Sequence, residues 1–294
     1  MKKILVTGSN GQLGSELQQL SAFYPGYQFL FTSRQELSIE DEDAVNDFIS
    51  KHQPDYCINC AAYTMVDKAE SEPEKAFLIN ADATSFLANA CANHNAQFIH
   101  ISTDYVFDGS SDRPYLETDA TNPIGTYAAS KQKGEQLTFQ YNSSAIVIRT
   151  SWVYSSYGNN FVKTMLRLMN ERENLNVVND QVGSPTYAAD LAKAIMDMVD
   201  YITEFPEKKL GGIYHYSNEG VITWYEFAVA IKELTASKCA VHPIPTSAYP
   251  TPAKRPAYSV FNKTKIKNTF QLSIPEWRES LQTCLLQLLR YTAK

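Results

Sequence analysis

The sequence predicts a doubly wound α/β fold with a parallel central sheet and a smaller, interleaved C-terminal domain. Short apolar strands alternate with helical patterns five times in the first 150 residues. A glycine-rich segment separates the first strand from the first helix, and after residue 150 the chain becomes aromatic and polar without a clean linker. We therefore expect a first domain at residues 1–150, a second domain mainly at residues 151–294, and a return of residues 185–205 to the first.

The first strand, residues 3–7, is apolar and leads into a G-x-x-G-x-x-G segment made of Gly8, Gly11 and Gly14. The first glycine permits a tight turn, the second lets a pyrophosphate approach the backbone, and the third allows close helix–strand packing. The phosphates would lie at the positive N-terminus of the helix that follows. We predict a dinucleotide site that includes Asn10, Gln12 and Leu13 in addition to Gly8 and Gly11.

The second strand, residues 27–32, ends at Thr32 and is followed by Ser33 and Arg34. A site that prefers NAD would place an acidic residue here to bind the ribose 2′-hydroxyl. A hydroxyl and a guanidinium suit a 2′-phosphate instead, so we predict NADPH as the cofactor. Glu36 follows closely enough to keep NADH possible.

The next helix is expected at residues 39–52, with Ser38 as its cap and Asp41 completing a capping box. A strand at residues 56–60 leads into the loop 61–67 at a strand C-terminus, where α/β sheets bind ligands. The small side chains of Ala61 and Ala62 would let this backbone lie along a cofactor. A long helix is predicted at residues 73–93, capped by Ser71.

The fourth strand, residues 98–102, delivers Thr103 to the carboxyl edge of the sheet, and we expect His100 to be a packed strand residue. The polar loop at residues 108–122 is long enough to suggest a functional role. A helix at residues 126–141 then carries Tyr127 and Lys131, and residues 145–150 form the fifth strand. Tyr127 and Lys131 are four residues apart and share one helix face, next to Thr103 in the fold.

Tyr127 and Lys131 together have the chemistry of a proton donor. A lysine cation near a phenol favours the phenolate and would lower the pKa of Tyr127 from about 10 toward working pH. Such a tyrosine can protonate a carbonyl oxygen while hydride arrives at the carbon. An ordinary pair on an amphipathic helix has the same spacing, so the pair indicates catalysis only together with the glycine loop and Thr103.

The second half is suited to binding a sugar. Its aromatic and polar segment begins near Trp152, and Arg255 lies in a Lys-Arg-Pro segment that can supply a cation to a diphosphate. Helices are predicted at residues 161–171, 190–201 and 224–234, the last with a capping box at Thr223. A final helix carries Trp277 and three leucines at helical spacing, which indicates core or dimer packing.

Composition excludes several partners and sites. The 294 residues are 44% hydrophobic with a net charge of −6, so we expect neither a nucleic-acid partner nor an anionic membrane surface. No run approaches a signal peptide or the roughly 18 apolar residues needed to cross a bilayer, which predicts a cytoplasmic protein. The five cysteines are odd in number and scattered. We predict structural thiols, although Cys57 and Cys60 have the spacing of a metal or redox pair.

The chain resembles the extended short-chain dehydrogenase/reductase family and, within it, the dTDP-4-dehydrorhamnose reductases, over nearly its whole length. The resemblance implies a Rossmann fold and NADPH-dependent reduction of the 4-keto group of dTDP-4-dehydro-L-rhamnose. It is carried by the glycine loop with Gln12 and Leu13, by residues 103–109 and 127–131, and by the segments 61–70, 149–154 and 179–186.

The resemblance also implies roles for single residues. Tyr127 would donate the proton, Lys131 would bind the nicotinamide ribose, and Thr103 would bind the substrate oxygen. Ala62 and Tyr63 would lie along the cofactor. The residues implied to contact the nucleotide sugar are Val66, Asp104 and Trp152.

A homodimer is expected, because symmetric dimers are the commonest assembly. Some members of the family hold magnesium between subunits. Glu16 is a candidate for one ligand, but Lys294 ends the sequence without an acidic ligand, so we assign no metal residue.

Two alternative functions remain open. A dehydratase or epimerase of the same superfamily is one, but Thr103 is followed by Asp104 and Tyr105, so the second acid of the related dehydratases is missing. A non-catalytic regulatory subunit is the other, and retention of Thr103, Tyr127 and Lys131 argues against it.

Overall fold

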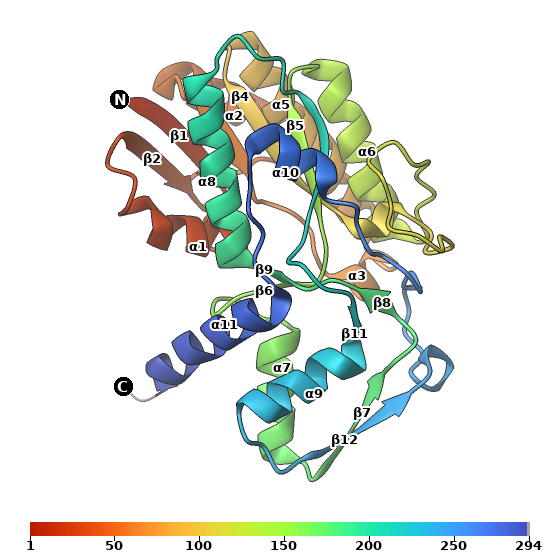
Figure 1. Ribbon diagram of the computed structural model, residues 1–294. Helices are drawn as coiled ribbons and strands as arrows, with labels where there is room; N and C mark the ends of the chain where they lie inside the picture. Colours follow the sequence, from red (N-terminus) through yellow and green to blue (C-terminus); the bar gives the residue numbers. More distant parts are fainter. Residues whose placement is uncertain (293–294) are drawn as a thin grey trace.

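A six-stranded parallel sheet forms the upper part of the molecule in Figure 1, and a smaller group of helices and short strands lies below it. The computed structural model describes residues 1–292. The strand order is β10-β5-β4-β3-β1-β2, and each neighbouring pair is parallel. The strands are β1 (Lys2–Thr7), β2 (Tyr27–Thr32), β3 (Tyr56–Asn59), β4 (Gln97–Thr103), β5 (Ile146–Thr150) and β10 (Gly212–Tyr216).

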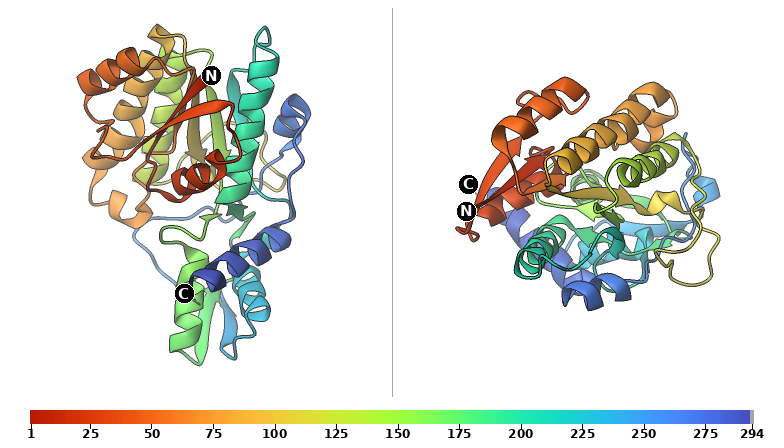
Figure 2. Two further views of the ribbon diagram at one scale, coloured as in Figure 1. Left: turned by 90° about the vertical axis from the view of Figure 1, so that its left-hand side faces the viewer. Right: turned by 90° about the horizontal axis from the view of Figure 1, so that it is seen from above.

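Helices cover both faces of this sheet, as the views in Figure 2 show. Successive residues of a strand point to opposite faces, so in β1 Ile4 and Val6 pack in one core and Leu5 in the other. The first core is closed by α1 (Gln12–Ser21), α8 (Ala188–Glu204) and α10 (Thr264–Phe270). On the other face lie α2 (Glu42–His52), α5 (Ala83–Asn93) and α6 (Thr126–Tyr141).

The lower part has a core of its own, in which Tyr154, Met165, Phe227 and Leu281 are buried. Its main helices are α7 (Phe161–Glu171), α9 (Trp224–Leu234) and α11 (Trp277–Thr292). Its strands pair in twos: β7 (Asn174–Val178) with β12 (Ala240–Ile244), β8 (Val182–Gly183) with β11 (Ile222–Thr223), and β6 (Val153–Tyr154) with β9 (Thr186–Tyr187). The short elements are α3 (Val66–Ala69), η2 (Asp104–Val106) and η3 (Thr246–Ala248).

The predicted α/β class and the first five strands are confirmed. The sixth strand, β10, was not predicted, although α8 leads into it and the strand lies beside β5. The exact division of the chain into domains stays a prediction. β10 belongs to the large sheet, and α8 and α10 pack on it. The second half of the chain therefore contributes to both parts of the molecule.

Two predicted helix caps are wrong, and one of the two helices begins later than predicted. The helix expected from residue 39 begins at Glu42, because Asp41 and not Ser38 accepts the free backbone N–H of Ala44. Ser71 does not cap the helix at residue 73, since its hydroxyl donates to the Lys68 carbonyl. The capping box of Thr223 and Glu226 is present as predicted.

The helix predicted at residues 73–93 runs through α4 (Pro73–Phe77), a π-helical segment η1 (Leu78–Asp82) and α5. Such π segments are rare and occur frequently at functional sites. The segment contains Asn80, which is 1% exposed.

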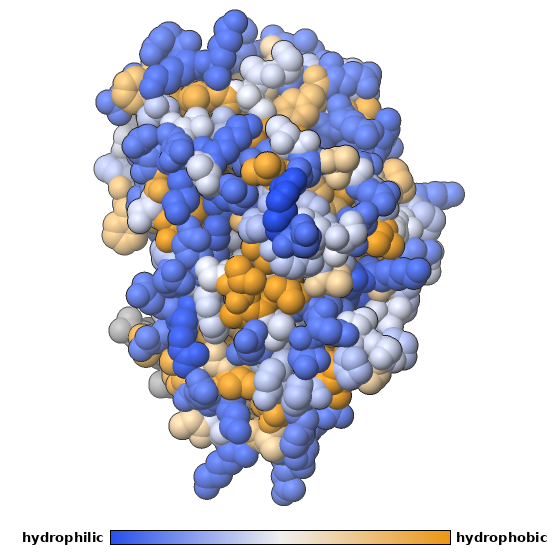
Figure 3. Space-filling view, turned by 45° about the vertical axis from the view of Figure 1, so that its right-hand side comes forward, coloured by the Kyte–Doolittle hydropathy of each residue, from blue (hydrophilic) through white to orange (hydrophobic). Residues whose placement is uncertain are grey.

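On the face shown in Figure 3 hydrophilic side chains predominate, and hydrophobic atoms gather near its centre. Within residues 1–292, none of the helices combines the length and the apolar character that crossing a bilayer requires.

Candidate active site

The carboxyl ends of the strands meet at the edge of the sheet that faces the lower part. The chain order reverses at β1, which pairs with β2 on one side and β3 on the other. Ligands bind at such a switch point, outside the carboxyl ends of the strands. Gly8 follows β1 and Ala61 follows β3 by two residues, while Thr103 ends β4. The sheet topology thus brings the three predicted segments to one place.

The glycine loop makes a close approach of backbone to backbone. Gly8 has a φ of +64°, and a Cβ placed there would lie 2.6 Å from the Ala61 nitrogen. A Cβ at Gly14 would lie 2.5 Å from the Gly8 carbonyl oxygen. Gly11 occupies the N-cap of α1, and no side chain accepts a hydrogen bond from the first turn. The N–H groups of that turn are therefore available to an anion.

A cavity of about 340 Å³ opens beside this loop. Seven of the residues predicted to bind the cofactor line it: Gly8, Asn10, Gly11, Ser33, Arg34, Ala61 and Ala62. The other lining residues are Gln35, Leu37, Ile39, Glu40, Cys60 and Ile79. None of these residues was predicted to bind the cofactor, although the apolar pair Leu37 and Ile39 just after the second strand was a usable signal.

Three residues expected at the cofactor have side chains that contact other parts of the protein. Leu13 is 7% exposed and packs in the core beneath the sheet. The Gln12 side chain accepts a hydrogen bond from Asn160 at 3.0 Å, which ties the glycine loop to the lower part. The Tyr63 hydroxyl donates to Glu72, although its backbone borders the site.

Asn80 fixes the position of the loop after β3. Its Oδ1 accepts from the Tyr63 nitrogen at 2.8 Å, and its Nδ2 donates to the Tyr63 carbonyl and to the Ser130 hydroxyl, each at 3.0 Å. The π segment therefore joins the loop after β3 to α6. No role was predicted for Asn80, because only tertiary contacts show which side chains it meets.

Arg34 and Glu36 take different positions around the cavity. The Arg34 guanidinium forms an ion pair with Glu40 at 3.0 Å, and both residues line the cavity. Glu36 accepts a hydrogen bond from the Ser33 nitrogen at 2.7 Å, and this bond lowers its pKa. The carboxylate of Glu36 is thus already bound to the backbone, whereas Arg34 is 65% exposed at its side chain.

Tyr127 and Thr103 lie side by side, close enough for the Thr103 hydroxyl to lower the pKa of the phenol. Burial is the larger effect and raises the pKa of Tyr127 to about 12, and the Asp104 charge raises it further. The expected lowering of this pKa is wrong. Its physical reason is that burial disfavours the phenolate, while the Lys131 nitrogen is bound elsewhere.

Lys131 is 2% exposed, and its Nζ donates to the Ile101 carbonyl at 2.7 Å. The same nitrogen lies 3.2 Å from His100 Nε2. Burial lowers the pKa of Lys131 to about 8, while the Glu135 carboxylate raises it. His100 is buried as predicted, and it also contacts the site directly.

Asp104 is 2% exposed, and burial raises its pKa to about 6. Its Oδ1 accepts a hydrogen bond from the Thr103 hydroxyl at 3.0 Å. The Tyr105 ring meets the Tyr127 ring edge to face, at 5.8 Å between centroids. Burial and the Asp104 charge raise the pKa of Tyr105, whereas the Arg255 charge lowers it.

A second cavity of about 630 Å³ lies in the lower part, and Phe161, Gln181, Trp224 and Arg255 are among its lining residues. Trp152 stacks on Trp224 with 3.6 Å between ring centroids. Trp152 has a φ of +48°, which a bulky residue rarely adopts. A strained backbone of this kind, held by packing, is a frequent property of functional residues.

Arg255 reaches across from this cavity to the loop after β3. Its Nη1 and Nη2 donate to the two Asp67 carboxylate oxygens at 3.1 Å and 2.8 Å. Asp67 follows Val66, which begins α3 and is half-buried. The arginine expected to bind a diphosphate is therefore paired with a carboxylate in this structure.

The polar loop at residues 108–122 is anchored to the C-terminal half. Tyr115 donates from its nitrogen to the Val260 carbonyl at 2.8 Å, and the Asn262 nitrogen donates back to the Tyr115 carbonyl. Whether this loop contributes to function stays a prediction.

Glu16, the candidate magnesium ligand, is bound to a residue of its own chain. Glu16 accepts a hydrogen bond from Ser155 at 2.6 Å, and burial raises its pKa. Within residues 1–292 no group of three or more His, Cys, Asp or Glu side chains lies close enough together to hold a metal. Lys294 lies outside the described residues. All five cysteines are free.

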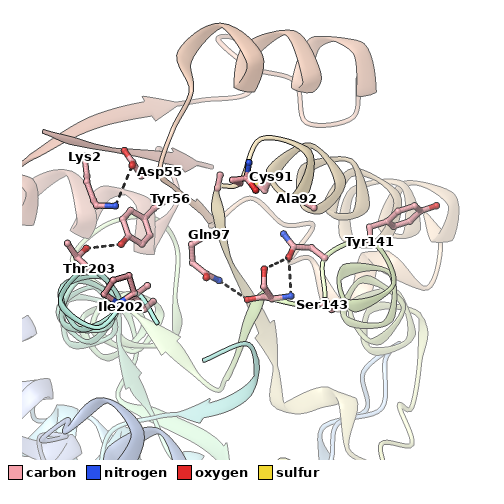
Figure 4. Close-up of a pocket in the computed structure, with 15 residues that line it drawn as sticks. Lys2, Asp55, Tyr56, Cys91, Ala92, Gln97, Tyr141, Ser143, Ile202 and Thr203 are labelled. Carbon is pink, nitrogen blue, oxygen red and sulfur yellow. Dashed lines mark hydrogen bonds and ion pairs between the residues drawn. The ribbon is translucent and has the colours of Figure 1, made fainter. Parts of the chain in front are cut away.

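A third cavity, of about 450 Å³, lies at the opposite end of the sheet (Figure 4). It is lined by Lys2 and Asp55, which form an ion pair at 3.5 Å, and by Tyr56, whose hydroxyl is 2.7 Å from that of Thr203. Gln97 donates to the Ser144 carbonyl beside them. None of the predicted site residues borders this cavity.

Comparisons with known proteins show which family the chain belongs to. The family model described as RmlD substrate binding domain matches residues 1–290. A dTDP-4-dehydrorhamnose reductase of Aggregatibacter actinomycetemcomitans is 42% identical over 96% of this chain and 98% of its own length. The crystal structure of a dTDP-4-dehydrorhamnose reductase from Clostridium acetobutylicum superposes with a TM-score of 0.91 at 40% identity, covering 98% of this chain and 99% of that one.

A dTDP-4-dehydrorhamnose reductase from Bacillus anthracis, solved in complex with NADP, superposes with a TM-score of 0.90 at 39% identity. The match covers 98% of this chain and 100% of that one. The glycine loop, the Thr103–Tyr127–Lys131 group and these full-length matches lead to one conclusion. The chain belongs to the family of dTDP-4-dehydrorhamnose reductases, which are nicotinamide-dependent oxidoreductases.

Proposed function

We propose that this protein uses NADPH to reduce the 4-keto group of dTDP-4-dehydro-L-rhamnose, giving dTDP-L-rhamnose, with Tyr127 as the proton donor. The observation that carries the proposal is the position of Thr103 and Tyr127 next to each other at the carboxyl edge of the sheet. The similarity to dTDP-4-dehydrorhamnose reductases supports the substrate.

The glycine loop and the cavity beside it suit the pyrophosphate and the adenosine end of a dinucleotide. The uncapped first turn of α1 offers N–H donors to a pyrophosphate, and the left-handed Gly8 keeps the loop against Ala61. Arg34 would hold a 2′-phosphate, which favours NADPH over NADH, and Lys131 would bind the nicotinamide ribose. When bound, the reduced nicotinamide supplies the hydride.

Tyr127 has the protonation state that reduction requires. With a pKa of about 12, the phenol keeps its proton at neutral pH and can give it to the oxygen that becomes an alkoxide. Thr103 would donate a hydrogen bond to the same oxygen after its hydroxyl turns from Asp104. The raised pKa therefore suits a proton donor, and a phenolate would suit the reverse reaction.

The nucleotide sugar would extend from Tyr127 into the lower cavity. Val66, Asp104 and Trp152 would contact the sugar, and Arg255 would bind the diphosphate after exchanging its partner Asp67 for a phosphate oxygen. The aromatic walls formed by Phe161 and Trp224 suit a base.

Two alternatives are less well supported. A dehydratase lacks its second acid, because Tyr105 follows Asp104 and its ring packs on Tyr127. A regulatory subunit needs no proton donor, whereas Thr103 and Tyr127 are held in reach of each other.

The decisive experiment follows NADPH absorbance in the presence of dTDP-4-dehydrorhamnose. A reductase consumes one NADPH for each sugar reduced. An epimerase or dehydratase would convert the sugar without net consumption of NADPH, and a regulatory subunit would do neither. We also propose a homodimeric, cytoplasmic protein, which light scattering and cell fractionation can test.

A further inference from the structure

A buried chain of hydrogen-bonding side chains runs across the sheet to the catalytic helix. It consists of Thr7 on β1, Asn59 on β3, His100 on β4 and Lys131 on α6, each of which is 2% exposed or less. The Thr7 hydroxyl donates to Asn59 Oδ1 at 2.7 Å. Asn59 Nδ2 lies 3.1 Å from His100 Nδ1, and His100 Nε2 lies 3.2 Å from Lys131 Nζ.

A backbone N–H group determines which atoms donate and which accept in this series of hydrogen bonds. The Ala61 N–H can only donate, and it meets Asn59 Oδ1 at 3.1 Å. The atom of Asn59 that faces Ala61 is therefore the oxygen, and the atom that faces His100 is the NH₂ group. Since an amide NH₂ can only donate, His100 Nδ1 must carry a lone pair. The imidazole is thus neutral with its proton on Nε2.

The proton on Nε2 faces the lysine nitrogen. An ammonium group has three hydrogens and no lone pair, so it cannot accept this hydrogen bond, whereas an uncharged amine can. One hydrogen of the lysine nitrogen is already directed to the Ile101 carbonyl at 2.7 Å. The amine form satisfies both contacts, and the ammonium form satisfies only one.

We propose that His100 is a positioning residue for Lys131, fixed by Asn59 in the tautomer that directs an N–H at the lysine nitrogen, and that it thereby favours the uncharged amine. The inference rests on the proposed function in one respect, namely that Lys131 contacts the cofactor. Lys131 then loses its proton at a lower pH than an ordinary lysine does.

The other titratable groups near Lys131 either favour the ammonium form or carry no charge at neutral pH. Glu135, one turn along α6, raises the pKa of Lys131, but its own carboxylate binds Arg149 on β5 at 2.9 Å and 2.7 Å. Burial lowers the pKa of Lys131 to about 8 and holds that of His100 well below its usual value. Tyr127, on the same helix, is uncharged below a pH of about 12.

The first test is nuclear magnetic resonance of the wild-type protein with ¹⁵N-labelled histidine and lysine. We expect His100 to remain neutral, with its proton on Nε2, when the pH falls through the usual histidine pKa of about 6.5. Lys131 should lose its proton near pH 8. A proton on Nδ1, or a titration of His100 near its usual pKa of about 6.5, would overturn the proposal.

The second test reverses the tautomer. In Asn59→Asp the carboxylate accepts from His100 Nδ1–H, so that Nε2 presents a lone pair to the Lys131 ammonium. The pKa of Lys131 should then rise by about one unit or more. Thr7→Val is the matched control, because the Ala61 N–H still orients Asn59 and the tautomer should not change.

An unchanged lysine pKa in a folded Asn59→Asp protein would contradict the inference. If that variant does not fold, the His100 tautomer measured in the wild-type protein tests the proposal by itself. These spectra need no turnover, so they are independent of the proposed function. A protein with the expected tautomer that did not oxidise NADPH would refute the function and leave the inference intact.

Discussion

The edge of the large sheet and the cavity in the lower part are held together by different interactions. At the sheet edge, Asn59, His100 and Lys131 are buried and joined by directional hydrogen bonds to neighbouring strands and backbone. In the lower cavity, the side chains are held by stacking of Trp152 on Trp224 and by the ion pair of Arg255 with Asp67.

The site at the sheet edge is therefore the more rigid of the two, and the lower cavity can adapt more easily to a ligand. Groups at the sheet edge come from adjacent strands, so their spacing follows from the strand register and changes little. Groups at the lower cavity come from segments far apart in the sequence, and Arg255 can exchange one oxygen partner for another. We expect changes at the edge to alter chemistry and cofactor affinity, and changes in the cavity to alter the KM for the nucleotide sugar.

The largest effect is expected for Tyr127→Phe, which removes the proton donor and keeps the ring. Turnover should fall by about 10²- to 10⁴-fold, while NADPH affinity changes little. Steady-state kinetics and a cofactor titration measure the two quantities. Tyr141→Phe is the control, because Tyr141 lies at the exposed end of the same helix. Near-native turnover in Tyr127→Phe would remove the proton-donor role.

Gly8→Ala should weaken NADPH binding by about 10- to 100-fold. Alanine at a φ of +64° costs about 1–3 kcal/mol of strain, and its Cβ would collide with the Ala61 nitrogen, so the loop must shift. Gly26→Ala is a matched control, since a Cβ there meets nothing within 4 Å. Cofactor fluorescence titrations of both variants test the prediction, and equal affinities would show that the loop does not bind NADPH.

Arg255→Ala should raise the KM for the nucleotide sugar by about tenfold, because one charge-assisted hydrogen bond to the diphosphate is lost. The affinity for NADPH should not change, since Arg255 lies in the lower cavity. Asp67→Asn keeps the arginine and removes its carboxylate partner, so it should not raise that KM. A rise of equal size in both variants would assign the ion pair a purely structural role.

The smallest effect is expected for Arg34→Ala. The KM for NADPH should rise about fivefold and that for NADH should stay constant, because the Arg34 side chain is largely exposed and its interactions are screened by water. Arg113→Ala removes another exposed arginine, paired with Asp119 outside the cofactor cavity, and serves as the control. A parallel loss with both cofactors would show that Arg34 does not read the 2′-phosphate.

Local sequence signals predicted most of the fold and the helix of the site that carries Tyr127 and Lys131. The helix at residues 126–141 and its Tyr127 and Lys131 were predicted with the observed bounds, because helical periodicity and spacing are local properties. The start of α2 was wrong by three residues, since Ser38 and Asp41 are both good caps and the sequence does not rank them.

The sequence by itself determined the strand–helix alternation, the glycine loop and the residue types that carry the chemistry. Only the tertiary structure decided the charge states and partners of these residues. Burial raised the pKa of Tyr127, which sequence spacing predicted to be lowered, and the contact with His100 and Ile101 took the Lys131 nitrogen. Solvent exposure and hydrogen-bond direction depend on residues distant in the chain, so no local pattern could supply them.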